Sequence, residues 1–256
     1  VIANADDPKL MEISESFPGR RVLYGVNAPA DYRASEVRDR ALLGSSFTLE
    51  AEGDRRPISF SIPGRHNLEN LLAAIATART AGISWEGIER GIGRIQPAYH
   101  RGVLVEWRGA TLYDDTYNSN PYALSRALEL LARAEARGRK IAVIGDMLEL
   151  GPDELKFHRD SGRSMPRSVD VIVGIGMRSE SLLAGARDAG FDPSALHHFP
   201  DAASATPFVR DLIREGDFVL LKGSRGIGLD RIIEALIGDD VASESSKFKV
   251  QGSTRT

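Results

Sequence analysis

Cysteine is absent from all 256 residues of this chain, which excludes disulfides, thiolate metal sites and a cysteine nucleophile. No apolar run approaches the roughly 18 residues that a membrane-spanning helix needs, so we expect no membrane partner. The formal net charge is only -3, so no basic field indicates nucleic acid as a partner. The absence of cysteine fits a reducing compartment, and we expect a cytoplasmic protein.

A P-loop of the form G-x-x-x-x-G-K-[ST] is also missing. The chain opens with Val1 to Pro8, a stretch that is typical of a strand end that runs into a helix cap. We therefore expect this chain to be a fragment of a larger protein. Residues 241–256 contain Ser, Lys and Gly with few large apolar side chains, and we expect a disordered tail there.

The segment Pro97–Gly102 separates two patterns and is interpreted as an interdomain hinge. Before it, short β-like runs such as Pro57–Ile62 precede a helix that ends near Gly82. After it, strands alternate with helices. The predicted strands are Val103–Trp107, Thr111–Tyr113, Lys140–Gly145, Val169–Gly174 and Phe218–Lys222. The predicted helices are Tyr122–Ala136, Glu154–Arg163, Ser179–Ala189, Ala202–Arg214 and Leu229–Ile237.

Several of the later strands, such as Ile141–Ile144, are apolar at every position. Continuous apolar strands between helices are typical of a parallel sheet with both faces covered. The sequence thus predicts an α/β protein with one domain over residues 1–98, a parallel-sheet domain over 99–240, and the tail.

A dense polar turn, Tyr113 to Pro121, follows one predicted strand. Ligands of α/β sheets bind just past the carboxyl ends of strands, so Asp114 and Asp115 are candidates to bind ribose hydroxyls. Alternatively, both aspartates only form and cap the turn. Asn120 is predicted as the N-cap and Pro121 as the first residue of the next helix.

Two further clusters have side chains that suit a nucleotide. Asn67 and Asn70 are three residues apart on one helix face, where two carboxamides could read a purine edge. The alternative is that Asn67 is an N-cap and Asn70 a surface residue. Arg101, in the hinge, suits phosphate because its guanidinium fork binds bidentately; otherwise it is a solvated charge.

Two more loops follow predicted strands. Asp146 and Glu149 could hold a cation or a substrate amine, or the loop could cap the helix at Glu154. The Gly-rich loop that contains Lys222 and Arg225 offers amides and two cations to an anion, although such loops are also plain turns. We assign no metal ligand and no certain catalytic residue within this chain.

In this order, the clusters resemble the Mur ligase family. The combination is far more selective than any single motif, since other branches differ at DDxYNxNP and GDMLELG. The resemblance covers about Val1 to Ile237. The motifs that carry it are Asn4–Asp7, Pro63–Asn67 with Asn70, Arg101, Asp114–Pro121, Gly145–Gly151 and Lys222–Arg225.

The resemblance implies the second half of a central ATPase domain followed by a whole C-terminal Rossmann-like domain. It places the sugar-binding domain, the P-loop and most Mg²⁺ ligands upstream of Val1, so we expect the fragment to be inactive alone. By position, Asn67 and Asn70 are similar to adenine-side contacts. Arg101 and Asp115 are similar to ATP and ribose contacts.

The remaining matches lie around the same implied site. Tyr117 and Asn118 are implied near the nucleotide and Asn120 near the incoming dipeptide. For Asp146, Glu149, Lys222 and Arg225 only a position near the cleft is implied. We expect Asp115→Ala to weaken ATP binding with little loss of folding.

The implied activity is an ATP-dependent amide ligase of peptidoglycan precursor synthesis. Its substrates would be ATP, UDP-MurNAc-tripeptide and D-Ala-D-Ala, with Mg²⁺ as cofactor, an acyl phosphate intermediate and a monomeric enzyme. Two alternatives stay open. One is another amide ligase of this family, MurE-like or cyanophycin-type, and the other is a non-catalytic nucleotide-binding module.

Overall fold

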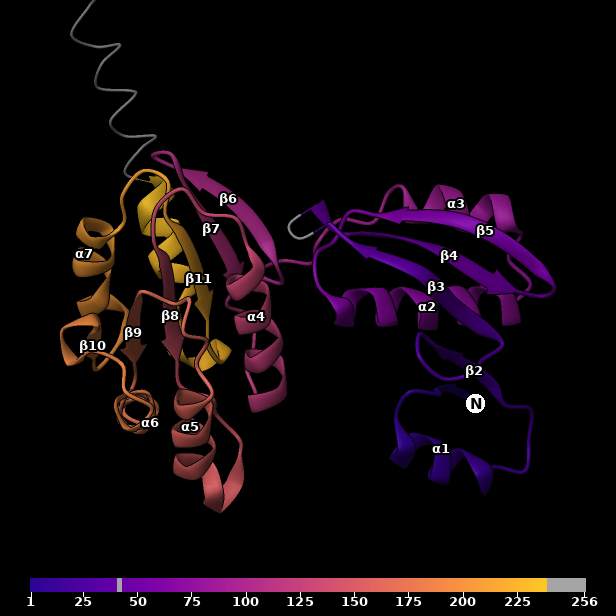
Figure 1. Ribbon diagram of the computed structural model, residues 1–256, viewed down its shortest axis with the longest axis horizontal. Coiled ribbons are helices and arrows are strands. Elements are labelled where there is room, and N and C mark those ends of the chain that lie inside the picture. Colours follow the sequence, from indigo (N-terminus) through magenta and orange to yellow (C-terminus); the bar gives the residue numbers. More distant parts are fainter. Residues whose placement is uncertain (41–42, 239–256) are drawn as a thin grey trace, which may run out of the picture. The chain divides into compact units, whose positions relative to one another are not determined.

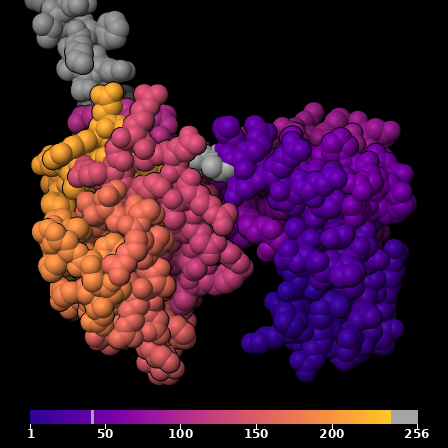
Figure 2. Space-filling model, in the orientation of Figure 1, coloured from indigo at the N-terminus to yellow at the C-terminus, as the bar shows by residue number. Residues whose placement is uncertain are grey.

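The computed structural model describes residues 1–40 and 43–238, and the chain divides into two compact units. The first is Val1–Gln96 and the second begins at Pro97, two residues before residue 99, where the second domain was predicted to begin (Figure 1). In the space-filling view the first unit is indigo to purple and the second magenta to yellow (Figure 2). The predicted tail, residues 241–256, lies outside the described residues.

The first unit has a five-stranded mixed sheet in the order β1-β2-β3-β4-β5. β1, β2 and β3 pair in parallel, whereas β3, β4 and β5 form antiparallel pairs. The strands are β1 (Ile2–Asn4), β2 (Val22–Gly25), β3 (Tyr32–Asp39), β4 (Ser45–Ala51) and β5 (Asp54–Phe60). The predicted short β runs are therefore parts of one sheet.

Three α-helices lie in the described part of this unit. They are α1 (Pro8–Glu15), α2 (Arg65–Thr80) and α3 (Trp85–Ile92). Asp7 caps α1 by accepting the amide hydrogens of Lys9 and Leu10, which confirms the predicted strand end and helix cap. The apolar stripe of α2 is buried in one core with the sheet, and its members are Leu68, Leu71, Leu72, Ile75 and Ala76.

The second unit is built on a six-stranded sheet in the order β10-β9-β8-β11-β7-β6. Its strands are β6 (Val103–Trp107), β7 (Ala110–Asp115), β8 (Lys140–Gly145), β9 (Val171–Ile175), β10 (Leu196–Phe199) and β11 (Phe218–Lys222). All neighbours are parallel except β6 and β7. Arg108 and Gly109 join those two strands with φ of 48° and 77°, a two-residue turn that forces an antiparallel hairpin.

Helices follow the strands of this sheet in alternation, as Figure 1 shows. They are α4 (Pro121–Arg133), α5 (Glu154–Arg163), α6 (Ser179–Asp188), α7 (Ala202–Leu212) and a last helix over 230–238. Ile141 and Val143 of β8 share a core with α7 and the last helix. Ala142 and Ile144 of the same strand are also buried, and they face the opposite side of the sheet. Both faces are covered, which confirms the predicted α/β architecture.

β10 was not predicted. Its sequence, Leu196-His197-His198-Phe199, places two imidazoles where an apolar strand would have valine or isoleucine. The strand lies at the sheet edge and is only half buried, so it has no need of a continuous apolar run. Within residues 1–40 and 43–238, no helix combines the length and the apolar character that crossing a membrane would require.

Candidate functional site

The carboxyl ends of β7, β11 and β8 lie side by side because these strands are neighbours and parallel. Lys222, the last residue of β11, is in register with Asp115 on one side and Ile144 on the other. The loops after these three strands therefore meet at one edge of the sheet. In α/β proteins this edge is where ligands bind.

Lys222 forms the base of this edge. Its side chain is 2% exposed, and its Nζ donates to Asp115 Oδ2 at 2.6 Å and to the Asn118 carbonyl oxygen at 2.9 Å. The interpretation of Lys222 as a loop cation that is open to an anion is therefore wrong. Asp115 also has a structural role, so the expectation that its loss would hardly affect folding needs correction.

Tyr117 is the common partner of two arginines. The Arg101 guanidinium carbon lies 4.1 Å from the centre of the Tyr117 ring, and that of Arg225 lies 5.6 Å from it. Both arginines are exposed, and the ring is half buried. Three residues far apart in sequence thus place two cations and one aromatic ring at the sheet edge.

Ser224 links two loops that sequence reasoning treated separately. Its Oγ accepts the amide hydrogen of Leu148 at 2.9 Å, and its own amide donates to the Asp146 carbonyl oxygen at 3.0 Å. Ser224 is buried, 4% exposed. The loop after β8 is thereby fixed against the Gly-rich loop after β11.

Asp146 is a helix cap and lies away from solvent. Its carboxylate is 2% exposed and accepts the amide hydrogens of Ser179 at 2.7 Å and Arg178 at 3.1 Å, at the start of α6. The capped helix is α6, so the alternative of a cap for the helix at Glu154 is wrong. Gly176 passes directly over this carboxylate with φ of 104°, and a Cβ there would lie 2.5 Å from Asp146 Cγ.

Glu149 and the two turn asparagines, Asn118 and Asn120, are all exposed. Glu149 is exposed and has a positive φ of 63°, uncommon for a non-glycine residue. Asn120 Oδ1 accepts the amide hydrogen of Ala123 at 2.8 Å, which confirms the predicted N-cap of α4. Asn118 is exposed, with Oδ1 accepting the Ser119 amide hydrogen at 2.8 Å.

His158, on α5, stabilises the loop after β8 through a hydrogen bond to its backbone. It is fully buried, its Nε2 accepts the Met147 amide hydrogen at 2.9 Å, and its Nδ1 lies 2.7 Å from the Glu154 carbonyl oxygen. These two contacts require a neutral ring with the proton on Nδ1. His158 is a structural residue.

In the first unit, the predicted adenine-side residues lie on α2. Gly64 is the N-cap, so the alternative that Asn67 fills this position is wrong. Asn67 instead lies in the first turn, and its Nδ2 donates to the Pro63 carbonyl oxygen at 2.7 Å. This bond orients the Asn67 amide, whereas Asn70, on the same face, is exposed.

Asp6 lies beside the start of α2 in the same unit. Its carboxylate accepts amide hydrogens from Val26 at 2.8 Å, Asn27 at 2.9 Å and Ala28 at 2.7 Å. Partial burial alone would raise the pKa of Asp6, but these three donors and the charge of Arg65 outweigh it, so the pKa is lowered. Asp6 therefore remains ionised and fixes the loop over residues 26–28.

The resemblance places most Mg²⁺ ligands upstream of Val1, and the described residues of the sheet edge form no set that would bind this ion. Of the carboxylates there, Asp115 contacts the Lys222 ammonium and Asp146 accepts two helix amides. Mg²⁺ is bound by ionised oxygens that are free to face it. Glu149, the exposed carboxylate of the loop after β8, is a single ligand, so the described residues of this edge do not fit the ion.

Comparisons with known proteins agree on one family. A model described as the Mur ligase middle domain matches residues 1–78, and one described as the Mur ligase, glutamate ligase domain matches residues 100–225. The UDP-N-acetylmuramoyl-tripeptide--D-alanyl-D-alanine ligase of Mycobacterium tuberculosis is 32% identical over 94% of this chain and 51% of its own length.

Solved structures show the same relation. MurF from Acinetobacter baumannii superposes with a TM-score of 0.81, at 28% identity, over 93% of this chain and 51% of that chain. MurF ligase from Thermotoga maritima, solved in complex with ADP, has a TM-score of 0.75 at 22% identity, over 92% of this chain and 53% of that chain. The chain spans about half the length of the curated relatives it matches.

Proposed function

Because the chain belongs to the Mur ligase family, we propose that it supplies middle-domain and C-terminal-domain residues of an ATP-dependent amide ligase. The enzyme joins D-Ala-D-Ala to UDP-MurNAc-tripeptide in peptidoglycan precursor synthesis. It acts as a monomer in the cytoplasm, a location that the absence of cysteine fits. The geometry of Tyr117 and its two arginines is the single observation that carries the proposal.

Arg101, Tyr117 and Arg225 are proposed to bind the nucleotide. Both guanidinium groups are exposed around one ring, so each can form bidentate bonds with phosphate oxygens. Asn118 lies in the same turn and is proposed as a further contact. Asp115, held in place by the buried Lys222, is proposed to bind the ribose hydroxyls.

The first unit is proposed to contribute the adenine-side contacts. Asn67 and Asn70 lie on one face of α2, and each carboxamide offers a donor and an acceptor to a purine edge. The bond from Asn67 to the Pro63 carbonyl oxygen orients one of the two amides in advance.

The residues proposed earlier for substrate binding now separate into two kinds. Glu149 is exposed and carries a charge that suits the ammonium group of the incoming dipeptide. Asp146 and Asn120 cap α6 and α4, and they are proposed to position the loops that surround the substrate. Lys222 is proposed to position Asp115.

The proposed chemistry has two steps. The tripeptide carboxylate attacks the γ-phosphorus of ATP, which releases ADP and forms an acyl phosphate. The dipeptide amine then attacks the acyl carbon, loses a proton, and expels inorganic phosphate as the amide forms. The arginines would neutralise charge on the phosphoryl group, and exclusion of water would protect the acyl phosphate.

The test is phosphate release from ATP by the full-length protein that contains this chain, with UDP-MurNAc-tripeptide, with and without D-Ala-D-Ala. We expect release that depends on the dipeptide. Arg101→Ala and Arg225→Ala should each raise the KM for ATP about tenfold or more, because each removes a charge-assisted bond to phosphate. Arg187→Ala, exposed in the last turn of α6, is the matched control.

Each contrary result has a distinct meaning. Turnover with a different amine and not with D-Ala-D-Ala would replace the proposed substrate by that of another Mur-type ligase. A folded protein that binds ATP without any release of phosphate would favour a non-catalytic nucleotide-binding module. An unchanged KM in both arginine variants would remove these residues from the nucleotide site.

A further inference from the structure

His100 is a buried residue at the sheet edge, and the proposed ligase chemistry does not use it. It is 9% exposed and has a positive φ of 55°. Its Nδ1 lies 2.5 Å from Asp114 Oδ2. The other oxygen of Asp114 accepts the Thr116 amide at 3.2 Å and the Thr116 hydroxyl at 2.8 Å, so the carboxylate is held on both sides. This arrangement fixes the orientation of the His100 ring.

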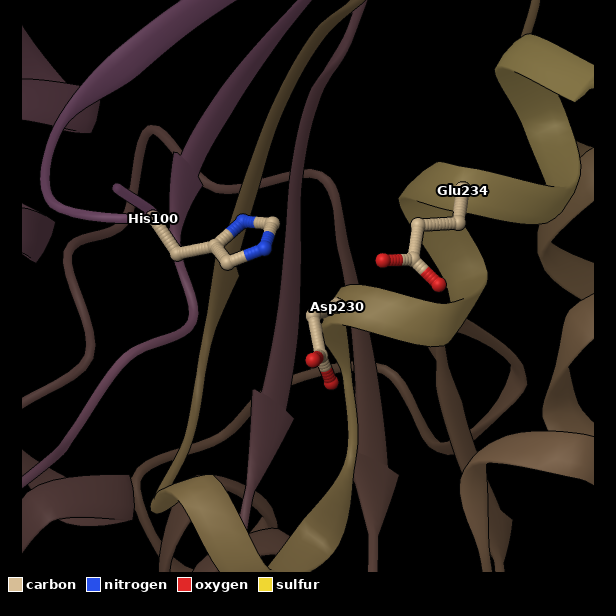
Figure 3. A group of neighbouring side chains, drawn as sticks. All are labelled: His100, Asp230 and Glu234. Atoms are coloured by element: carbon tan, nitrogen blue, oxygen red, sulfur yellow. The ribbon is translucent and has the colours of Figure 1, made fainter.

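The second ring nitrogen of His100 is left without a partner. His100 Nε2 is buried and has no hydrogen-bond partner among the described residues. Figure 3 shows that the ring faces Asp230 and Glu234 on the last helix. One ligand atom from each of the three side chains lies within 4.8 Å of the other two. An unpaired buried nitrogen beside two carboxylates is costly unless something binds between them.

We propose that His100, Asp230 and Glu234 form a binding site for a divalent transition metal ion of the Zn²⁺ class. One imidazole and two carboxylates are common ligands of this ion, and three protein ligands leave the fourth position to water. Ca²⁺ and Mg²⁺ prefer oxygen ligands only, so the imidazole disfavours them.

Asp114 supplies the second feature of such a site. A metal-binding histidine usually donates its other ring N–H to a carboxylate, which selects the tautomer and raises the basicity of the ligand nitrogen. Here Asp114 contacts Nδ1, so Nε2 is directed at the two carboxylates. Because ligand atoms of one zinc ion lie roughly 3–4 Å apart, a rotamer change of the exposed Glu234 would complete the site.

The charges around the group also favour a cation. Neither Asp230 nor Glu234 forms an ion pair with lysine or arginine in the part of the chain that the structure describes. The group thus combines two carboxylates that have no lysine or arginine partner among the described residues with a buried imidazole nitrogen that has no hydrogen-bond partner.

A bound ion would join three segments of the second unit. His100 lies just after the start of this unit, Asp114 belongs to β7, and both acids belong to the last helix. The His100 carbonyl oxygen also accepts the Tyr117 amide hydrogen at 3.0 Å. The ion would therefore stabilise the backbone that carries Arg101 and Tyr117.

The test is calorimetric titration of the untagged 256-residue chain with Zn²⁺. We expect one ion per chain, with affinity lowered about tenfold or more in His100→Gln, Asp230→Asn and Glu234→Gln. Glu234 is exposed, so its variant should fold normally, as circular dichroism will check. His198→Gln, which removes the histidine 3.7 Å from Glu180, is the matched control and should bind as before.

Imidazole ¹⁵N NMR separates metal binding from simple charge pairing. On adding Zn²⁺, we expect a metal-induced shift of His100 Nε2 while Nδ1 keeps its proton toward Asp114. A doubly protonated ring with no response to saturating Zn²⁺ would overturn the proposal. So would a stoichiometric site that survives Glu234→Gln and Asp230→Asn but disappears in His198→Gln.

Discussion

Each unit holds a carboxylate at the end of a strand, and the two are stabilised in opposite ways. Asp6, after β1, accepts hydrogen bonds from three consecutive backbone amides. Asp115, at the end of β7, contacts the ammonium group of the buried Lys222. The first arrangement depends on the path of the main chain, and the second depends on one side chain.

This difference decides which site can tolerate substitution. A carboxylate that is held by backbone amides loses its own bonds when it is replaced, but it leaves only partly exposed donors behind. An ion pair with one fully buried member leaves an uncompensated charge when either partner is removed. The second unit should therefore be the more sensitive of the two at its strand-end carboxylate.

The largest effect is expected for Lys222→Met, which keeps the side-chain volume but removes the charge. Asp115 and the Asn118 carbonyl oxygen lose their donor, and we expect about 3–5 kcal/mol less free energy of unfolding. Urea unfolding measures it, with the exposed Lys156→Met as control. The double variant Lys222→Met with Asp115→Asn should recover part of this free energy. A loss below about 1 kcal/mol in Lys222→Met alone would contradict the expectation that the second unit is the more sensitive of the two.

Asp217 combines both arrangements and should give an intermediate effect. It accepts the amide hydrogens of Arg139 and Arg214 and pairs with the Arg139 guanidinium at 2.6 Å. We expect Asp217→Asn to cost about 1.5–3 kcal/mol, because the bonds to a charged acceptor become neutral ones. Urea unfolding at neutral pH measures this loss.

The same residue predicts an acid response. Burial would raise the pKa of Asp217, but Arg139 and the backbone donors outweigh it and lower the pKa. Its stabilisation is then complete above the ordinary aspartate pKa of about 3.9 and is lost as the pH falls through the lower folded value. As the pH falls below about 4, Asp217→Asn should lose less free energy of unfolding than the original chain. Equal slopes of the unfolding free energy against pH in the two proteins would contradict a stabilising role of the ionised Asp217.

A smaller effect is expected for Asp6→Asn in the first unit. The amide still accepts one backbone hydrogen bond, and the site is open to water, so we expect about 1 kcal/mol. Hydrogen exchange of the Val26 and Ala28 amides should become faster while the second unit is unchanged. Glu12→Gln, exposed on α1, is the control.

The smallest effect is expected for Arg101→Ala. Its contact with Tyr117 is exposed, and such a cation–π contact contributes about 0.5–1 kcal/mol. Thermal unfolding should shift little, while the NMR resonances of the Tyr117 ring should move. A large loss of stability would mean that Arg101 is a structural residue, unlike the nucleotide contact that we propose.

Much of the second unit could be predicted from local patterns. The apolar runs of β8 and β11 and the bounds of α5 agree with the prediction, because buried parallel strands and amphipathic helices have strong periodicities. The N-cap of α4 followed from Asn120 and Pro121. The bounds of β6 also agree with the prediction, but its antiparallel direction and the edge strand β10 did not follow, since pairing partners and edge positions are not local properties.

At the site, the sequence by itself determined which polar loops follow strands, because turn residues and strand ends are encoded within a few positions. Only the tertiary structure decided what those side chains contact. In the folded protein, Lys222 contacts Asp115 and Asp146 caps α6. His100 lies close to Asp230 and Glu234. These partners are separated by 33 to more than 100 positions, as the separation of 107 between Lys222 and Asp115 illustrates. No local pattern encodes such contacts, because they depend on how strands pair and helices pack.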